Sequence, residues 1–218
     1  VVPGSGSKVY DGTALTKTEH DDFTVTGVPE GFTWAATADG TVTNVTPGEG
    51  EKAVNAVTSF KIFNADGEDV TDQFANIDTT ATGTLTITAR PITIKANDAT
   101  NEYTGSTITY ATASDAVKPY YAVTNQGTDT GLAPDQEITA ATLSGEGIEA
   151  KTYPITITDG SVVISTIAGE DEEAVATTDN YSITLQPGTL TITQSSASIT
   201  VVPGSGSKVY DGTALTKT

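Results

Sequence analysis

An 18-residue stretch, VVPGSGSKVYDGTALTKT, occurs twice in this chain without a single change, at residues 1–18 and again at residues 201–218. A compact single domain has no need of identical first and last segments. The repeat is typical of a tandem array, in which a unit of 200 residues is followed by the start of the next unit. It therefore predicts a repetitive, extended protein.

A weaker repeat divides the 200-residue unit. The run GTLTIT closes both halves, at residues 83–88 and 188–193, and Glu102–Ile108 aligns with Val9–Leu15. We expect a first β module at residues 1–89, a second at 90–196, and the start of the next repeat at 197–218. If the chain is a window of an array, residue 1 lies halfway along a strand that crosses a module boundary, and the first strand of the first module is truncated.

The composition and its periodicity favour strands. Thr is abundant, Val, Ile and Tyr recur, and apolar and polar residues alternate in stretches such as 23–27 and 83–88. The predicted fold class is all-β, with two tandem small β-sandwich (Ig-like) modules in an elongated array. The alternative is a β-grasp-like module with one short helix.

Two local signals refine this expectation. Asp39-Gly40 stands between two alternating runs, 32–37 and 41–45, which predicts a hairpin. Pro134 followed by acidic residues is a helix-start pattern, and residues 133–143 leave room for a short helix only.

No flexible linker separates the modules. Arg90–Ala96 continues almost directly from the GTLTIT run, and residues 197–202 take the same place after the second such run. We therefore expect a strand to pass from one module into the next at each boundary. Pro91, whose ring fixes φ, should limit bending at the first boundary.

Charge and missing residue types exclude several functions. The formal net charge is −18, and −19 without the C-terminal copy, which argues against nucleic-acid and anionic membrane partners. No apolar run is long enough to span a membrane. The absence of Cys removes disulfides, thiolate nucleophiles and Cys-based zinc sites.

The structural motif Tyr10-Asp11-Gly12-Thr13, with its counterparts Tyr103 and Gly105, fits a turn at a strand end. In that interpretation Tyr packs inward, Asp accepts a backbone N–H, and Gly adopts positive φ. A recognition loop is the competing interpretation. The second copy keeps Tyr and Gly and has Thr104 in place of the Asp, which favours the structural role.

No catalytic, cofactor-binding or metal-binding residues are expected. His20 lies among acids without a supported nucleophile. Calcium is the one cofactor considered, at acidic clusters that lack EF-hand spacing. Three further interpretations fit particular residues: a sugar platform of Trp34, Tyr120 and Tyr121, an isopeptide bond joining Lys8 or Lys95 to Asn76 or Asn180, and solvated turns at the acidic residues Asp66, Glu68, Asp69, Asp72 and 170–173.

Lys-Val-Tyr-Asp-Gly-Thr at residues 8–13, followed by Gly-Thr-Leu-Thr-Ile-Thr at 83–88, resembles the YDG and MBG-type tandem repeat modules of large bacterial cell-surface adhesins. Residues 60–62, 66–71, 151–157 and 179–183 carry the resemblance further along the chain. It implies all-β modules in secreted or cell-wall-bound bacterial proteins, and no catalytic residues.

The expected function is therefore that of a structural repeat in an extracellular adhesin or filament, a rigid stalk at the bacterial cell surface. The alternative is a multivalent module that binds host glycan, mucin or protein. The expected partners are neighbouring repeats of the same protein, including end-to-end strand completion between copies, and a host glycan or protein. Residues 201–218 should pack poorly as an isolated tail or complete a neighbouring chain.

Overall fold

The computed structural model describes residues 1–46, 53–111, 121–125, 131–167 and 173–216. It is all-β, which confirms that part of the predicted fold class. The described residues contain no α-helix, only the short 3-10 turns η1 (His20–Asp22), η2 (Thr71–Gln73) and η4 (Thr178–Asn180). None of their helices has the length and apolar character needed to cross a membrane.

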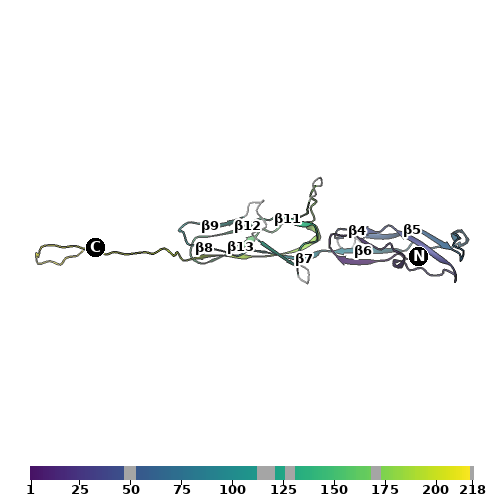
Figure 1. Ribbon diagram of the computed structural model, residues 1–218, viewed down its shortest axis with the longest axis horizontal. Helices are drawn as coiled ribbons and strands as arrows, with labels where there is room; N and C mark the ends of the chain where they lie inside the picture. The colour runs from purple at the N-terminus through teal and green to yellow at the C-terminus, as the bar shows by residue number, and fades with distance from the viewer. Residues whose placement is uncertain (47–52, 112–120, 126–130, 168–172, 217–218) are drawn as a thin grey trace.

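The molecule is long and narrow (Figure 1). We call residues 1–89 the first module, 90–196 the second module and 197–218 the tail. The first module lies at one end, the second module in the middle, and the tail projects from the opposite end as an extended segment. The tail carries no strand in its described part, 197–216, so the strand expected at the second boundary is absent there.

The described residues of the first module form two sheets, ordered β1-β6-β5-β3 and β2-β4. Its strands are β1 (Gly6–Val9), β2 (Leu15–Thr16), β3 (Thr33–Ala38), β4 (Thr41–Val42), β5 (Ala53–Phe63) and β6 (Thr82–Thr88). β1 runs parallel to β6, whereas β5 is antiparallel to both β3 and β6.

In the part of the second module that the structure describes there are three sheets, ordered β10-β7-β15, β11-β14 and β8-β16-β13-β12-β9. Its first five strands are β7 (Arg90–Ala96), β8 (Ala99–Glu102), β9 (Ile108–Ala111), β10 (Tyr121–Asn125) and β11 (Gln136–Ala140). The remaining strands are β12 (Leu143–Gly147), β13 (Thr152–Ile157), β14 (Val163–Thr166), β15 (Tyr181–Gln186) and β16 (Gly188–Thr193).

The hairpin prediction was wrong, and the question left open at residues 133–143 is answered. β3 pairs with β5 and β4 pairs with β2, so Asp39-Gly40 joins two sheets and does not close a hairpin. The buried side chain of Asn55 accepts a hydrogen bond from the Gly40 N–H at 2.9 Å and holds this crossing. The helix considered at 133–143 is strand β11, which pairs with β14 and buries Ile138 against the core.

The two modules repeat one hydrogen-bonding scheme. In the first module the Ile62 carbonyl accepts a hydrogen bond from the Val70 N–H at 2.9 Å. In the second, the Ile164 carbonyl accepts one from the Thr177 N–H at 2.8 Å. β1 pairs with β6 as β8 pairs with β16, with Gly6 opposite Leu85 and Ala99 opposite Leu190. This places Tyr10 and Tyr103 at equivalent positions, each donating its N–H at 2.9 Å to the last residue of β6 or β16.

The apolar core is continuous across the module boundary. Alternation along β6 buries Leu85 and Ile87, and after the single residue Ala89 the buried residues continue with Ile92 and Ile94 on β7. β7 is buried along most of its length because it lies between β10 and β15. The main buried cluster includes Tyr10 of the first module among residues of the second.

Candidate functional site

The YDG turn is built by its own residues. Asp11 Oδ1 accepts the Thr13 N–H at 2.9 Å and the Thr13 hydroxyl at 2.8 Å, and it pairs with Lys8 Nζ at 2.7 Å. The hydrogen bond from Lys8, together with those from Thr13, holds the pKa of Asp11 down at about 2. Gly12 has φ +83°, a conformation that disfavours any side chain.

The turn places Tyr10 at the junction between the modules, where its side chain is buried. Its ring meets the ring of Tyr181 edge to face, with 5.6 Å between centroids. Gln136 Nε2 donates to the Tyr10 hydroxyl at 2.6 Å. Such an aromatic pair adds about 0.5–1.5 kcal/mol beyond the burial of its area.

Gln136 links the junction together. Its Oε1 accepts from the Tyr181 hydroxyl at 2.6 Å and from the Thr177 hydroxyl at 2.9 Å. The Tyr181 hydroxyl also accepts the Ala133 N–H at 3.0 Å. Burial raises the pKa of Tyr181, so its phenol stays protonated and remains a donor.

Two further side chains fix the same boundary. Arg90 is buried directly after the boundary residue, and its Nε donates to the Gly131 carbonyl at 2.9 Å. Asn180 accepts the Val45 N–H at 2.7 Å and donates to Asn44 Oδ1 at 3.1 Å, so it joins segments from both modules. The junction is therefore a packed and hydrogen-bonded interface around the connecting strand.

Tyr103 and Tyr210 repeat the local sequence of Tyr10 but not its burial. Tyr103, at the far end of the second module, is 42% exposed, and Tyr210 in the tail is 91% exposed. Gly105 has φ +80°, so its turn resembles that of Gly12. Tyr10 alone of these three has a following module to pack against among the described residues.

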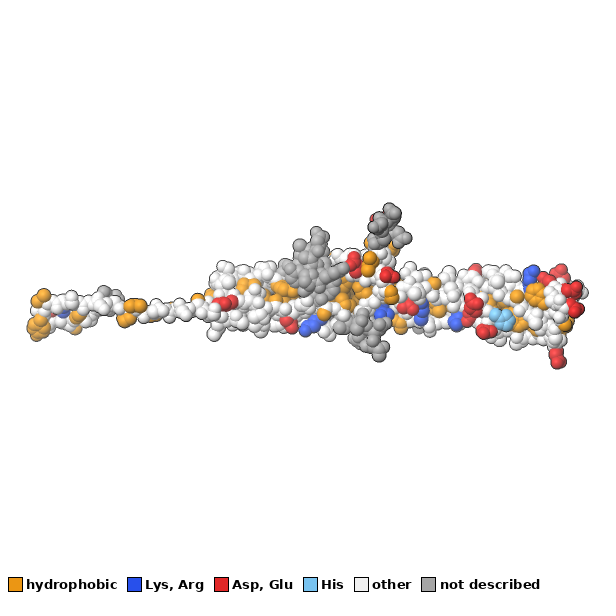
Figure 2. All heavy atoms as spheres, in the orientation of Figure 1, with side chains coloured by type: hydrophobic (Ala, Val, Ile, Leu, Met, Phe, Trp, Pro, Cys, Tyr) orange, Lys and Arg blue, Asp and Glu red, His pale blue; other side chains and the backbone are white. Residues whose placement is uncertain are grey.

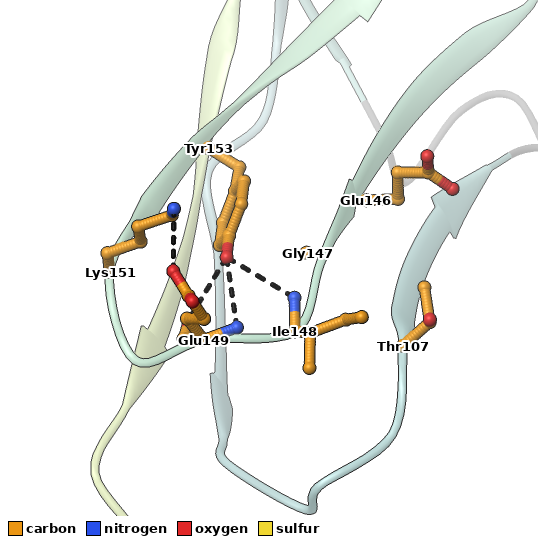
Figure 3. A pocket seen from close by; sticks show the side chains of 7 residues that line it. All are labelled: Thr107, Glu146, Gly147, Ile148, Glu149, Lys151 and Tyr153. Atoms are coloured by element: carbon orange, nitrogen blue, oxygen red, sulfur yellow. Dashed lines mark hydrogen bonds and ion pairs between the residues drawn. The ribbon is translucent and has the colours of Figure 1, made fainter.

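A groove of 470 Å³ lies near the far end of the second module (Figure 3). Its polar groups pair with each other. The Tyr153 hydroxyl accepts the Glu149 N–H at 2.9 Å, and Lys151 pairs with the Glu149 carboxylate at 2.8 Å while lying over the Tyr153 ring. These contacts tie the β12–β13 loop, and no nucleophile lies beside a base among the labelled residues.

The other sequence-based candidates are dispersed. His20 stacks on Trp34 with 4.0 Å between centroids. Neither Lys8 nor Lys95 has an Asn among its described partners. Among the described residues, no three or more His, Cys, Asp or Glu side chains lie in an arrangement that could hold a metal ion. Tyr120, the side chain of Tyr121 and acidic residues 170–172 lie outside the described part.

Sequence reasoning identified the turn but not its partners. Gln136, Tyr181, Arg90 and Asn180 were not singled out for a junction. One signal was available, because Thr-Asp-Gln-Phe at 71–74 and Thr-Asp-Asn-Tyr at 178–181 mark the same 3-10 turn in both modules. Nothing in the local sequence marks Gln136, because its partners Tyr10 and Tyr181 lie 126 and 45 positions away along the chain.

Comparisons of the chain with protein-family models, with curated proteins and with solved structures found no match.

Proposed function

We propose that this chain is a structural repeat of the YDG/MBG type from a bacterial extracellular adhesin or filament, and that it acts as a rigid spacer at the cell surface. The burial of Tyr10 at the module junction carries the proposal, because a flexible linker would leave this tyrosine exposed. Each module is proposed to be a small Ig-like β-sandwich. The duplicated 18-residue stretch supports repetition, and the long, narrow shape supports reach.

The junction has the features that resist bending. A hinge needs backbone freedom and few contacts, whereas one residue separates β6 from β7 here, and Arg90, Gln136 and Asn180 hydrogen-bond across or beside the boundary. Bending the modules apart would expose the Tyr10–Tyr181 pair and leave buried polar groups unpaired. Each such group costs about 1–3 kcal/mol.

Spin labels test the rigidity directly, because the chain has no Cys that would be labelled by accident. Labels at Ser59→Cys in the first module and Ser144→Cys in the second report the distance between the modules. We expect a narrow distribution in the full chain and a broad one after Tyr10→Ala.

Tyr210→Ala is the matched control, since it changes the same local sequence in the exposed tail and should leave the distribution narrow. A broad distribution in the chain with native Tyr10 would contradict the rigid-spacer proposal. Saturable binding of this chain on a glycan array or to mucin would favour the alternative of a binding module.

A further inference from the structure

We infer that Asp159, at the tip of the loop between β13 and β14, is a site of spontaneous isoaspartate formation in the folded protein, with the Gly160 amide nitrogen as the nucleophile. The inference concerns covalent chemistry within one module, and it holds whether or not the chain is a rigid spacer.

The reaction joins an aspartate side chain to the backbone nitrogen of the next residue. That nitrogen attacks Cγ of the protonated carboxyl, and one carboxyl oxygen leaves as water, which closes a succinimide ring. Water then opens the ring between the nitrogen and the former main-chain carbonyl, so that the chain runs through Cγ as isoaspartate. One water is lost and one is regained. Glycine after the aspartate favours the attack, because it has no Cβ to hinder the approach of its nitrogen.

Asp-Gly pairs occur at five places in the sequence, residues 11–12, 39–40, 66–67, 159–160 and 211–212. The dipeptide alone therefore does not single out a reactive site. The folded structure does, because the carboxylate or the glycine N–H is held by hydrogen bonds at some of these pairs and not at others.

At Asp11 the carboxylate is held. Its Oδ1 accepts from Lys8 Nζ at 2.7 Å and from the Thr13 N–H at 2.9 Å, and these bonds keep the pKa of Asp11 at about 2. Only the protonated carboxyl releases water. With a pKa of about 2 in place of the ordinary 3.8, that form is at least about tenfold rarer near pH 5. Asp211 repeats these contacts, with Lys208 and Thr213.

At Asp39 both reacting groups are held. The Gly40 N–H donates to Oδ1 of the buried Asn55 at 2.9 Å, and Asp39 Oδ1 accepts the Ala56 N–H at 3.2 Å. Attack by the Gly40 nitrogen would first have to break a buried hydrogen bond, so this pair is protected.

At Asp66 only the nitrogen is held. The Gly67 N–H donates to the Asn64 carbonyl at 3.0 Å, whereas Asp66 itself is exposed. This hydrogen bond lies in an exposed turn and opens more easily than the buried bond of Gly40. We therefore expect Asp66 to react at an intermediate rate.

At Asp159 neither group is held. In the part of the chain that the structure describes, no hydrogen bond or ion pair reaches the Asp159 carboxylate or the Gly160 N–H. Both residues are exposed, and a Cβ placed on Gly160 would meet no atom within 4 Å. The succinimide ring and the extra backbone carbon of isoaspartate therefore have room to form without unfolding.

The two sides of this loop are fastened while its tip is open. The Thr158 N–H donates to the Thr142 carbonyl at 2.8 Å, and Ser161 Oγ accepts the Thr142 N–H at 3.0 Å. The change in backbone length is confined between these two anchors. Isoaspartate at Asp159 should thus accumulate with the age of the chain while the second module stays folded.

Digestion of aged, folded chain tests the order of rates. The full chain is kept near pH 5 at body temperature, sampled over weeks, unfolded and digested with endoproteinase Asp-N, which cuts before aspartate and not before isoaspartate. Loss of cutting at Asp159 should proceed at least about tenfold faster than at Asp11 or Asp39, with Asp66 between them. Mass spectrometry should detect an intermediate lighter by one water in the peptide that contains Asp159.

The same chain aged in urea is the matched control, because unfolding removes the hydrogen bonds that distinguish the pairs, and the rates should then converge. Asp159→Glu, whose longer side chain disfavours ring closure, should abolish the water-light species in that peptide. Rates at Asp159 and Asp11 that are equal in the folded chain, or that differ as much in urea as in the folded chain, would overturn the inference.

Discussion

Four Asp-x-Thr triplets in this chain adopt the same local geometry. In each, Asp Oδ1 accepts both the N–H and the hydroxyl of the Thr two residues later, at Asp11, Asp69, Asp78 and Asp211. The pKa of each of these Asp residues is lowered, to about 2 for Asp11 and Asp69. Because Asp211 keeps the geometry in an exposed tail, the turn is encoded locally and forms without tertiary contacts.

Acid should weaken the fold through Asp11. Its folded pKa of about 2 lies below the ordinary 3.8, so its stabilising contribution is present above pH 4 and is lost as the pH falls toward 2. We expect the unfolding free energy of the Asp11→Asn chain to fall less between pH 4 and pH 2 than that of the native chain. The difference should stay below about 1 kcal/mol, because solvent screens this partly exposed ion pair.

Urea unfolding at several pH values measures this contribution. Asp211→Asn, the same change in the tail, should leave the pH dependence of unfolding as it is. An equal effect of the two substitutions would show that the contribution does not come from the folded first module.

Tyr10 should contribute through its hydroxyl as well as its ring. Tyr10→Phe keeps the ring packing and leaves Gln136 Nε2 without the 2.6 Å bond, which should cost about 1 kcal/mol of unfolding free energy. Tyr210→Phe should cost nothing measurable. Thermal and urea unfolding of both variants measure this difference. If Tyr10→Phe were as stable as Tyr210→Phe, the hydrogen bond described at the junction would be wrong.

At the scale of elements, two glycines set the approach of neighbouring strands. A Cβ on Gly83 would lie 2.1 Å from the Gly4 carbonyl oxygen, and one on Gly188 would lie 2.5 Å from that of Ala96. These are equivalent positions, at the start of β6 and β16, where the last strand of each module meets the chain entering it. The glycine of each GTLTIT run is therefore required for close packing of backbone on backbone.

Gly83→Ala and Gly188→Ala should each destabilise the chain by roughly 1–3 kcal/mol through overpacking against backbone that cannot move aside. Gly6→Ala is the matched control on β1, since its nearest neighbour is the flexible side chain of Lys17 at 3.2 Å. Chemical denaturation of the three variants checks the prediction. If Gly83→Ala were as stable as Gly6→Ala, the close approach of the Gly83 and Gly4 backbones would be wrong.

Strand-forming segments could be predicted from the sequence because period-2 alternation and turn residues are local. The pairing of strands could not. Asp39-Gly40 carries a good hairpin signal, yet β3 is longer and more apolar than β4 and gains more by pairing with the eleven-residue β5. Likewise, the YDG turn was predictable from Asp11 and Gly12, whereas the burial of Tyr10 depends on a module that begins 80 residues later.

At the scale of the whole molecule, charge governs how copies meet. The formal net charge is −18, whereas the tail carries two Lys and one Asp. Acidic side chains gather at the end of the molecule formed by the first module (Figure 2). Repulsion between copies is therefore strongest at that end.

The parallel pairing of β1 with β6, and of β7 with β15 and β8 with β16, has a mechanical consequence. In the first module the first strand, β1, and the last strand, β6, run side by side in the same direction; in the second, the first two strands, β7 and β8, run parallel to the last two, β15 and β16. Tension applied to the two ends of the chain therefore pulls these strands past each other, and all the hydrogen bonds of a pair bear load together. Single-molecule pulling from the two ends of the chain should unfold each module in a separate event at high force. Pulling between β3 and β6 should open the sheet of the first module at lower force, because its hydrogen bonds then break one after another.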